Sequence, residues 1–244
     1  MKIKIHDTTY IFLLIAFLSG YFEYIFLFLI TIFIHESGHY FFSKIIGFKY
    51  AKIVIYPFGG LTIYDEDLNI STNKELFALA GGIIFQLLFY FFIVILYKNN
   101  YVTTHVYSII KNINYLLISF NFMPILPLDG GKLTNIVFDK LFNYKLSNKL
   151  SIIISIIFIL FFMIYNKTYY SIILSLFLIK NIYYEIVNYK YRFNKFILER
   201  YLNNYKFNKI KKVKTINKFK RDYTHIINNE FESKYLSKLF DRTS

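Results

Sequence analysis

The stretch His35-Glu36-Ser37-Gly38-His39 decides how the rest of this 244-residue chain is organised. Residues four positions apart lie on one face of a helix, so His35 and His39 can bind one cation together. Glu36 follows the first histidine and can stand beside a water molecule on that cation. Zinc lowers the pKa of such a water toward about 7, and a neighbouring carboxylate can then accept its proton. The pattern therefore predicts a zinc site with Glu36 as general base.

The residues on both sides of this motif are strongly apolar. Residues 24–34 precede it and residues 40–42 follow it, and neither run contains a charged side chain. In a soluble helix, a chance match or polar side chains satisfied in a core would be a reasonable alternative. Ionisable groups are unfavourable in lipid and usually mark a functional site there, so the apolar setting favours the metal site.

The composition predicts an integral membrane protein. Hydrophobic residues make up 56% of the chain, the mean hydropathy is +0.40, and long apolar runs recur. Cysteine is absent, which excludes disulfides and thiolate zinc sites. No cleavable signal peptide is expected, because no small-residue cleavage site follows the apolar run after Tyr10.

The apolar runs predict an all-α polytopic membrane protein with about six transmembrane helices. The expected spans are residues 8–20, 23–43, 76–97, 113–128, 150–165 and 168–186. Lysines gather in alternate connections and at the two ends, and the remaining loops carry only Lys98, Lys111 and Lys167. This distribution predicts that both termini are cytoplasmic and that the histidines face the cytosol. Within the third span, Gln86 and the run Ala80-Gly81-Gly82 are interpreted as helix-packing features.

A short β-hairpin is expected beside the site. Two β-rich runs within residues 48–64 flank the turn residues Pro57, Phe58, Gly59 and Gly60. The edge of such a hairpin can pair with an extended substrate strand. A plain connector is an equally good interpretation of the same residues.

A catalytic zinc ion needs a third protein ligand. Three other histidines stand alone near span ends or in the C-terminal segment and are expected to be structural or solvated: His6, His105 and His225. Asp129 is the better candidate, because Pro124 and Pro127 break the preceding helix and broken helices at membrane depth line cavities. A helix-ending turn with a capping aspartate is the alternative.

Together, the motif at residues 35–39 and the run Asn121-x-x-Pro124-x-x-Pro127-Leu-Asp129-Gly resemble the site-2 protease family of intramembrane zinc metalloproteases. The hairpin, the span count and the segment after Tyr189 are similar to the sporulation branch of that family. The resemblance implies one zinc ion per chain, held by His35, His39 and Asp129, with Glu36 as general base. It also implies that Asn121 and Pro124 help to position the substrate.

The same resemblance implies a membrane-associated pro-protein as substrate, which in the sporulation branch is the inactive precursor of a sigma factor. Inhibitory membrane protein partners are expected, and nucleic acid is not. The third span departs from the family pattern, because Gly81-Gly82 is followed by Ile83 where members often carry Gly-Pro and then Asn.

Two domains are expected, a membrane-embedded metalloprotease domain over residues 1–189 and a basic cytosolic tail over residues 190–244. The tail is too short for a complete nucleotide-sensing CBS domain, although residues 222–227 resemble a remnant of one.

Two other functions would use the residues of the expected metal site. A metal-ion transporter would use four polar side chains along its ion pathway: His35, Glu36, His39 and Asp129. An inactive relative of the proteases would act as a binding scaffold.

Overall fold

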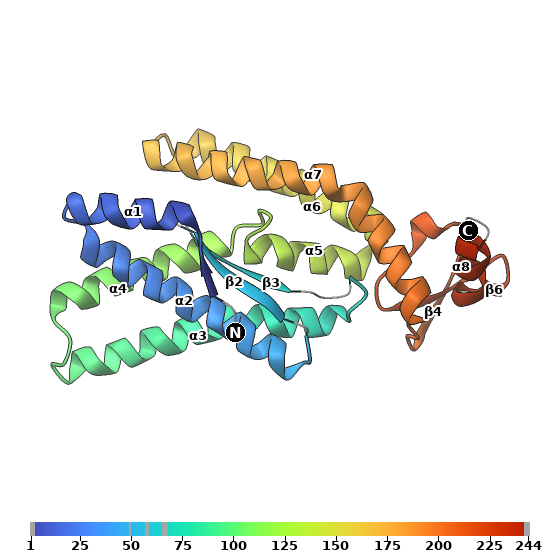
Figure 1. Ribbon diagram of the computed structural model, residues 1–244, viewed down its shortest axis with the longest axis horizontal. Coiled ribbons are helices and arrows are strands. Elements are labelled where there is room, and N and C mark those ends of the chain that lie inside the picture. Colours follow the sequence, from blue (N-terminus) through green and yellow to red (C-terminus); the bar gives the residue numbers. More distant parts are fainter. Residues whose placement is uncertain (1–2, 49, 57–58, 65–67, 242–244) are drawn as a thin grey trace. The chain divides into compact units, whose positions relative to one another are not determined.

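The computed structural model describes residues 3–48, 50–56, 59–64 and 68–241 (Figure 1). The chain forms two compact units. The first comprises Met1–Glu66 and Leu76–Asn121, and the second comprises Asp67–Glu75 and Phe122–Ser244. Pro57 and Phe58, which were expected at the hairpin turn, lie outside the described residues.

Four helices contribute to the first unit: α1 (Asp7–Leu18), α2 (Phe22–Ile45), α3 (Thr72–Lys98) and α4 (Thr104–Asn121). Helix α2 packs on α4 through a small apolar cluster of Ile32, Ile113 and Leu117. The motif at residues 35–39 therefore lies in a long apolar helix, as its flanking sequence predicts.

The expected hairpin is present and belongs to a three-stranded sheet. Strand β2 (Tyr50–Tyr56) pairs antiparallel with β3 (Gly59–Tyr64), with Tyr56 opposite Gly59. The N-terminal strand β1 (Ile3–Ile5) pairs parallel with the other edge of β2. Both β2 and β3 contact α2, the helix that carries the histidine motif (Figure 1).

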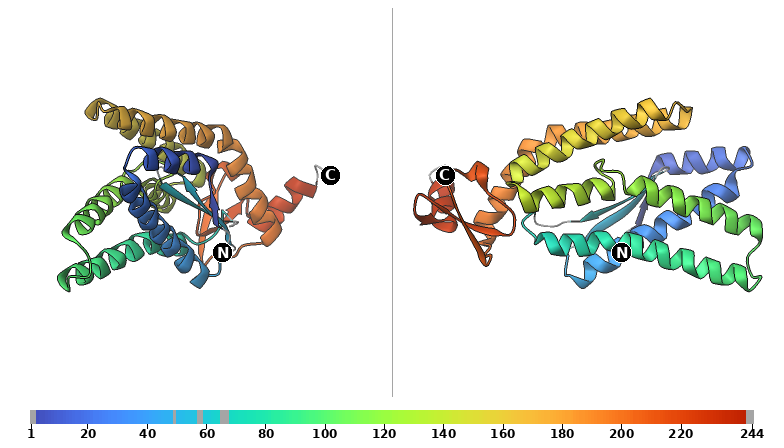
Figure 2. Two further views of the ribbon diagram at one scale, coloured as in Figure 1. Left: turned by 60° about the vertical axis from the view of Figure 1, so that its left-hand side comes forward. Right: turned by 180° about the vertical axis from the view of Figure 1, so that it is seen from behind.

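The second unit contains α5 (Asp129–Leu141), α6 (Tyr144–Tyr165) and α7 (Tyr169–Asn203). Helices α6 and α7 run side by side, which both views in Figure 2 show. Helix α7 continues without a break through residues 190–203, across the boundary that the sequence suggests near residue 189.

Beyond α7 the chain folds into a second three-stranded sheet with a short helix. Strand β4 (Lys209–Val213) pairs parallel with β5 (Tyr223–Ile227), and β5 pairs antiparallel with β6 (Glu230–Phe231). The short helix η1 (Ile216–Lys218) and helix α8 (Glu232–Phe240) complete it. Its core is formed by Val213, Phe219, Ile227 and Leu236 together with side chains from the preceding helices: Tyr144 of α6 and Phe193, Phe196 and Ile197 of α7.

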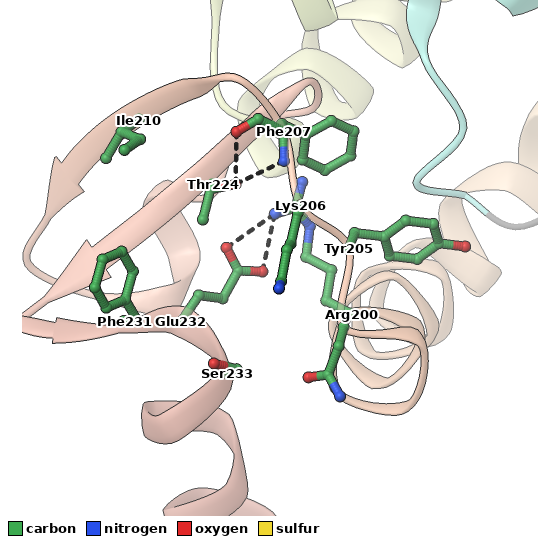
Figure 3. A pocket seen from close by; sticks show the side chains of 10 residues that line it. Arg200, Tyr205, Lys206, Phe207, Ile210, Thr224, Phe231, Glu232 and Ser233 are labelled. Atoms are coloured by element: carbon green, nitrogen blue, oxygen red, sulfur yellow. Dashed lines mark hydrogen bonds and ion pairs between the residues drawn. The ribbon is translucent and has the colours of Figure 1, made fainter.

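Two buried arginines hold this part of the second unit together. Arg200 of α7 pairs with Glu232 at 2.9 Å, and Figure 3 shows this pair against the neighbouring side chains. Arg221 pairs with Asp139 of α5 at 3.0 Å and with Glu75 at 2.7 Å. Burial raises the pKa of the Asp139 carboxyl to about 6, although the charge of Arg221 opposes this shift. The buried charges are thus compensated by partners from distant parts of the sequence.

The expectation of a mainly helical membrane protein is confirmed, whereas the term all-α omits two small sheets. Among the described residues, four helices are long and apolar enough to cross a membrane: Phe22–Ile45, Thr72–Lys98, Tyr144–Tyr165 and Ser171–Asn203. Helix α1 is apolar but has 12 residues, fewer than the roughly 17 that a span needs.

The expected span over residues 113–128 is wrong. The helix in this region is α4, which ends at Asn121, and the next seven residues form turns before α5 begins. Pro124 and Pro127 cannot donate backbone hydrogen bonds and so cannot continue a helix. The amide of Ile125 instead donates to the carbonyl of Met123, and that of Leu128 donates to Ile125.

Candidate metal centre

The two histidines of the motif meet as the helical spacing predicts. His35 and His39 are 4% exposed, and their Nε2 atoms are 3.1 Å apart. Glu36 lies beside them on α2 and is also buried. This arrangement fits two imidazoles that share one cation.

The other nitrogen of each imidazole is held by α3. His35 Nδ1 lies 2.9 Å from Gln86 Oε1, and His39 Nδ1 lies 3.1 Å from the carbonyl oxygen of Ala78. A carbonyl oxygen accepts a hydrogen bond, so each Nδ1 carries the proton and each Nε2 presents a lone pair. Two lone pairs facing each other at this distance repel unless a cation or a proton lies between them. The donor set therefore fits a metal ion bound through both Nε2 atoms.

Gln86 is fixed in the orientation that this role requires. Its side chain is fully buried, and its Nε2 lies 3.4 Å from the backbone oxygen of Asn114 on α4. With the amide nitrogen directed at that carbonyl, the amide oxygen faces His35. Gln86 therefore sets both the tautomer and the ring orientation of His35, as hydrogen-bond partners of metal-binding histidines do.

Two glycines allow α2 and α3 to approach closely enough for these contacts. A Cβ atom added at Gly38 would lie 2.2 Å from the carbonyl oxygen of Gly81, so a larger residue at either position would push the helices apart. This is the close approach that small residues permit between membrane helices.

Gly82 makes room for the two imidazoles themselves. A Cβ atom there would lie 2.3 Å from His39 Nε2 and 2.8 Å from His35 Cε1. The surface of α3 at this point is therefore shaped around the nitrogen atoms that would bind the metal.

Strand β3 contacts the general base of the predicted site. A Cβ atom added at Gly60 would lie 2.3 Å from Cγ of Glu36, so the strand backbone lies directly against this side chain. Gly59 has no such neighbour within 4 Å. Of the expected hairpin residues, Gly60 thus lies next to the motif, and Gly59 is the first residue of β3.

Asn121, the last residue of α4, also reaches the histidine pair. Its Nδ2 lies 3.5 Å from His35 Nε2, and its side chain is half-buried. The structure therefore brings together, within the first unit, the motif and the asparagine of the second sequence pattern.

Asp129 is the first residue of α5 and is 7% exposed. Lys132, one turn later, places its Nζ 3.6 Å from Asp129 Oδ1. The preceding turns pack tightly on this helix end. A Cβ atom at Gly130 would lie 2.4 Å from the carbonyl oxygen of Phe122, and one at Gly131 would lie 2.4 Å from the carbonyl carbon of Ile125. The two glycines thus let the turns hold Asp129 in a buried position.

Pro124 belongs to these turns, and α6 supports them. Ser155 Oγ accepts a hydrogen bond from the amide of Leu126 at 2.9 Å and lies 3.5 Å from the carbonyl oxygen of Pro124. The turn residues and the start of α5 therefore form one locally braced structure within the second unit.

The other three histidines are occupied elsewhere. His6 caps α1 and stacks on Tyr56, and His105 is exposed near Glu23. His225 is fully buried and contacts Glu232. Each has the structural or solvated setting that its isolated position in the sequence predicts.

Replacing Gln86 with leucine should weaken zinc binding by roughly 10- to 100-fold, the range for losing a hydrogen-bond partner of a metal-binding histidine. Leucine keeps the volume but leaves His35 Nδ1 without its acceptor. Zinc affinity of the purified protein is the measurement. Gln86→Glu keeps the acceptor and should retain zinc. Thr31→Val, which changes another buried polar residue that bonds only along α2, is the control. Equal affinities for Gln86→Leu and Thr31→Val would contradict this role.

Replacing Gly82 with alanine should also lower zinc affinity, by at least about tenfold, because the new methyl group displaces the imidazoles without removing a ligand atom. Gly59→Ala is the matched control, since open space surrounds that position. Normal zinc affinity in Gly82→Ala would show that the imidazoles do not bind the metal in this geometry.

The chain is similar to known proteins in both sequence and fold. Residues 23–103 match the model of the family described as Peptidase family M50. The fold matches the solved site-2 protease from Methanocaldococcus jannaschii with a TM-score of 0.61 and 22% identity, over 75% of this chain and 89% of that one. The resemblance to the site-2 protease family that the two motifs suggest is thus confirmed.

Two curated relatives are more specific. The chain is 26% identical to stage IV sporulation protein FB of Bacillus subtilis strain 168 over 140 residues, 57% of this chain and 49% of that protein. It is 28% identical to a zinc metalloprotease of Methanocaldococcus jannaschii over 120 residues, 47% of this chain and 34% of that protein. The chain thus spans about half or less of the length of these relatives. The expected similarity to the sporulation protein is confirmed.

Proposed function

We propose that this chain is an intramembrane zinc metalloendopeptidase of the site-2 type. The observation that carries the proposal is the His35–His39 pair, in which hydrogen bonds to both Nδ1 atoms direct two Nε2 lone pairs at one point. Glu36 is buried beside them in an apolar helix long enough to cross a membrane. The match to Peptidase family M50 over residues 23–103 and the zinc metalloprotease relative support the same chemistry.

The proposed ligands of one zinc ion per chain are His35, His39 and Asp129. Two imidazoles and one carboxylate are a usual ligand set for catalytic zinc, which leaves a fourth position for water or substrate. The burial of Asp129 and the two tightly packed glycines that follow it suit a ligand held in a fixed place.

In the proposed reaction, Glu36 is the general base. Zinc, when bound, would polarise the scissile carbonyl and lower the pKa of water toward about 7. Glu36 accepts a proton from the attacking water as the water oxygen bonds to the carbonyl carbon. Glu36 then donates this proton to the nitrogen of the leaving amine as the peptide bond breaks. Gln86 holds His35 in place throughout.

The substrate is proposed to bind as an extended strand. Among the described strands, β3 pairs with β2 alone, so its other edge can accept a further strand. The contact of Gly60 with Glu36 would bring such a strand next to the general base. Peptide bonds within a helix are hidden from attack, so a transmembrane substrate must unwind locally. Asn121 and Pro124 are proposed to hold the substrate chain near the metal, consistent with the proximity of Asn121 to His35.

The proposed substrate is a membrane-associated pro-protein, with the precursor of a sporulation sigma factor as the specific candidate. The similarity to stage IV sporulation protein FB supports this choice. Inhibitory membrane partners are proposed on the same ground. The lysine distribution supports cytoplasmic termini and a site open to the cytosol. The six spans expected from the sequence would need α1 and α4 in addition to the four long apolar helices.

Residues 1–189 are proposed to be the protease domain, and residues 190–244 a cytosolic regulatory segment.

The test of the function is co-expression of the full chain with a sporulation sigma-factor precursor in bacterial membranes. Cleavage that a zinc chelator stops and added zinc restores is the expected result. Metal flux into liposomes without cleavage would instead support a transporter, and zinc retention without cleavage of any membrane substrate would support a scaffold.

A further inference from the structure

A basic pocket of about 610 Å³ lies in the second unit, and its lining residues include none of those proposed for catalysis. Four lysines line it: Lys140 from α5, Lys206 and Lys209 from the segment after α7, and Lys220 before β5. Phe207 and Tyr223 supply its aromatic wall, and Tyr223 lies within 5.8 Å of Lys209 Nζ and 5.1 Å of Lys220 Nζ.

The positive charge of this pocket exceeds the negative charge of its lining, which is that of Asp222 alone. Within the described part of the chain, none of the four lysines forms an ion pair with a carboxylate. Lys140 Nζ instead donates to Asn73 Oδ1 at 2.8 Å, and Lys220 Nζ donates to the carbonyl oxygen of Leu141 at 3.2 Å. Each ammonium group therefore retains further donors for a ligand, because an ammonium has three.

The other charged groups of the lining are already engaged. Arg221 pairs with Asp139 and Glu75, and the carboxylate of Asp222 accepts hydrogen bonds from the amide and hydroxyl of Thr72. The pocket therefore has four lysines available to a bound anion and one carboxylate already satisfied.

The neighbouring pocket of the C-terminal sheet provides a contrast. It is larger, about 650 Å³, but its buried Arg200 is paired with Glu232, as Figure 3 shows. Its guanidinium charge is thus compensated within the protein, and its other cation, Lys206, also lines the lysine pocket.

The position of the lysine pocket indicates which anion it meets. Thr72, which lines it, is the first residue of α3, and α3 is long and apolar enough to cross a membrane. Lys140 lies just before α6, a second such helix, whose first amide, that of Tyr144, donates to the carbonyl of Phe219 next to Lys220. The ends of membrane helices lie at the depth of the lipid headgroups, where lysine and tyrosine side chains gather.

We propose that this pocket binds a phosphate group, that of an anionic phospholipid headgroup, through Lys140, Lys206, Lys209 and Lys220. A phosphate oxygen accepts strong charge-assisted hydrogen bonds from ammonium groups. Basic residues at the ends of membrane helices bind anionic headgroups by the same electrostatic attraction. The bound lipid would bridge α5, the start of α3 and the C-terminal sheet. This proposal does not depend on the proposed protease activity, because the pocket includes none of the residues proposed for catalysis.

The test is phosphatidylglycerol binding by the full-length protein in phosphatidylcholine nanodiscs, measured by native mass spectrometry after titration with phosphatidylglycerol. The test variant is Lys140→Gln/Lys206→Gln/Lys209→Gln. These three side chains are exposed, so the fold should survive. The control is Lys212→Gln/Lys214→Gln/Lys218→Gln, which removes the same charge from exposed lysines of the same region outside this pocket.

We expect the test variant to bind phosphatidylglycerol at least roughly tenfold more weakly, while the control stays within about twofold of the unaltered protein. Equal weakening in both variants would mean diffuse surface attraction and would overturn the proposal. Inorganic phosphate that binds the unaltered protein but not the test variant, while both bind phosphatidylglycerol equally, would overturn the lipid assignment. Retained binding in the test variant would overturn the site itself.

Discussion

Replacing Glu36 with glutamine is expected to abolish substrate cleavage while zinc stays bound. Glutamine has nearly the same size and keeps one oxygen, but it cannot accept a proton at neutral pH. Loss of a positioned general base typically lowers the rate by about 10²- to 10⁴-fold. The imidazoles of His35 and His39 keep their partners on α3, so the metal site itself should persist.

The measurement compares cleavage and zinc content in the same membrane preparation for the unaltered protein and Glu36→Gln. Ser37→Ala is the matched control, because Ser37 is the next residue of α2 and its hydroxyl bonds back to Phe33 within the helix. Cleavage by Glu36→Gln at an undiminished rate would rule out Glu36 as the base. Loss of zinc in that variant would show that the carboxylate supports the metal site instead.

The histidine motif could be predicted because its geometry is local. A spacing of four residues places His35 and His39 on one helical face wherever that helix packs. The hairpin could also be proposed, since its two strands are neighbours in sequence, although the same residues fitted a plain connector equally well. The parallel pairing of β1 with β2 was not foreseen, because it joins residues about 50 positions apart and three residues carry little signal.

The contacts that α3 makes with the two histidines could not be predicted from the residue types of α3. Gln86 and Gly82 were interpreted as helix-packing features, and the structure gives both a direct contact with the histidines. Gln86 is 51 positions from His35, so the register of α3 against α2 decides which α3 side chains meet the imidazoles. A glutamine within an apolar run is the one signal that was available, because buried polar groups in lipid need partners.

The C-terminal segment shows where composition misleads. Its long basic stretch predicts a basic cytosolic tail, yet Arg200 and Arg221 are both buried. Their partners Glu232, Asp139 and Glu75 come from the far end of the segment, from α5 and from the start of α3. Such long-range ion pairs are invisible in a charge count.

The most direct test of the account is the zinc content of the detergent-purified protein beside that of Asp129→Ala. Asp129 is the proposed third ligand, so its loss should lower zinc affinity by more than about 100-fold, beyond the 10- to 100-fold typical of groups that only support a ligand. Asp139→Asn is the matched control, because it alters another buried aspartate of α5 that pairs with Arg221.

The account predicts about one zinc ion per chain in the unaltered protein and in Asp139→Asn, and little or none in Asp129→Ala. An unchanged zinc content in Asp129→Ala would contradict the assignment of Asp129 as the third ligand. Absence of zinc from the carefully handled unaltered protein would contradict the proposal that the chain is a zinc metalloprotease.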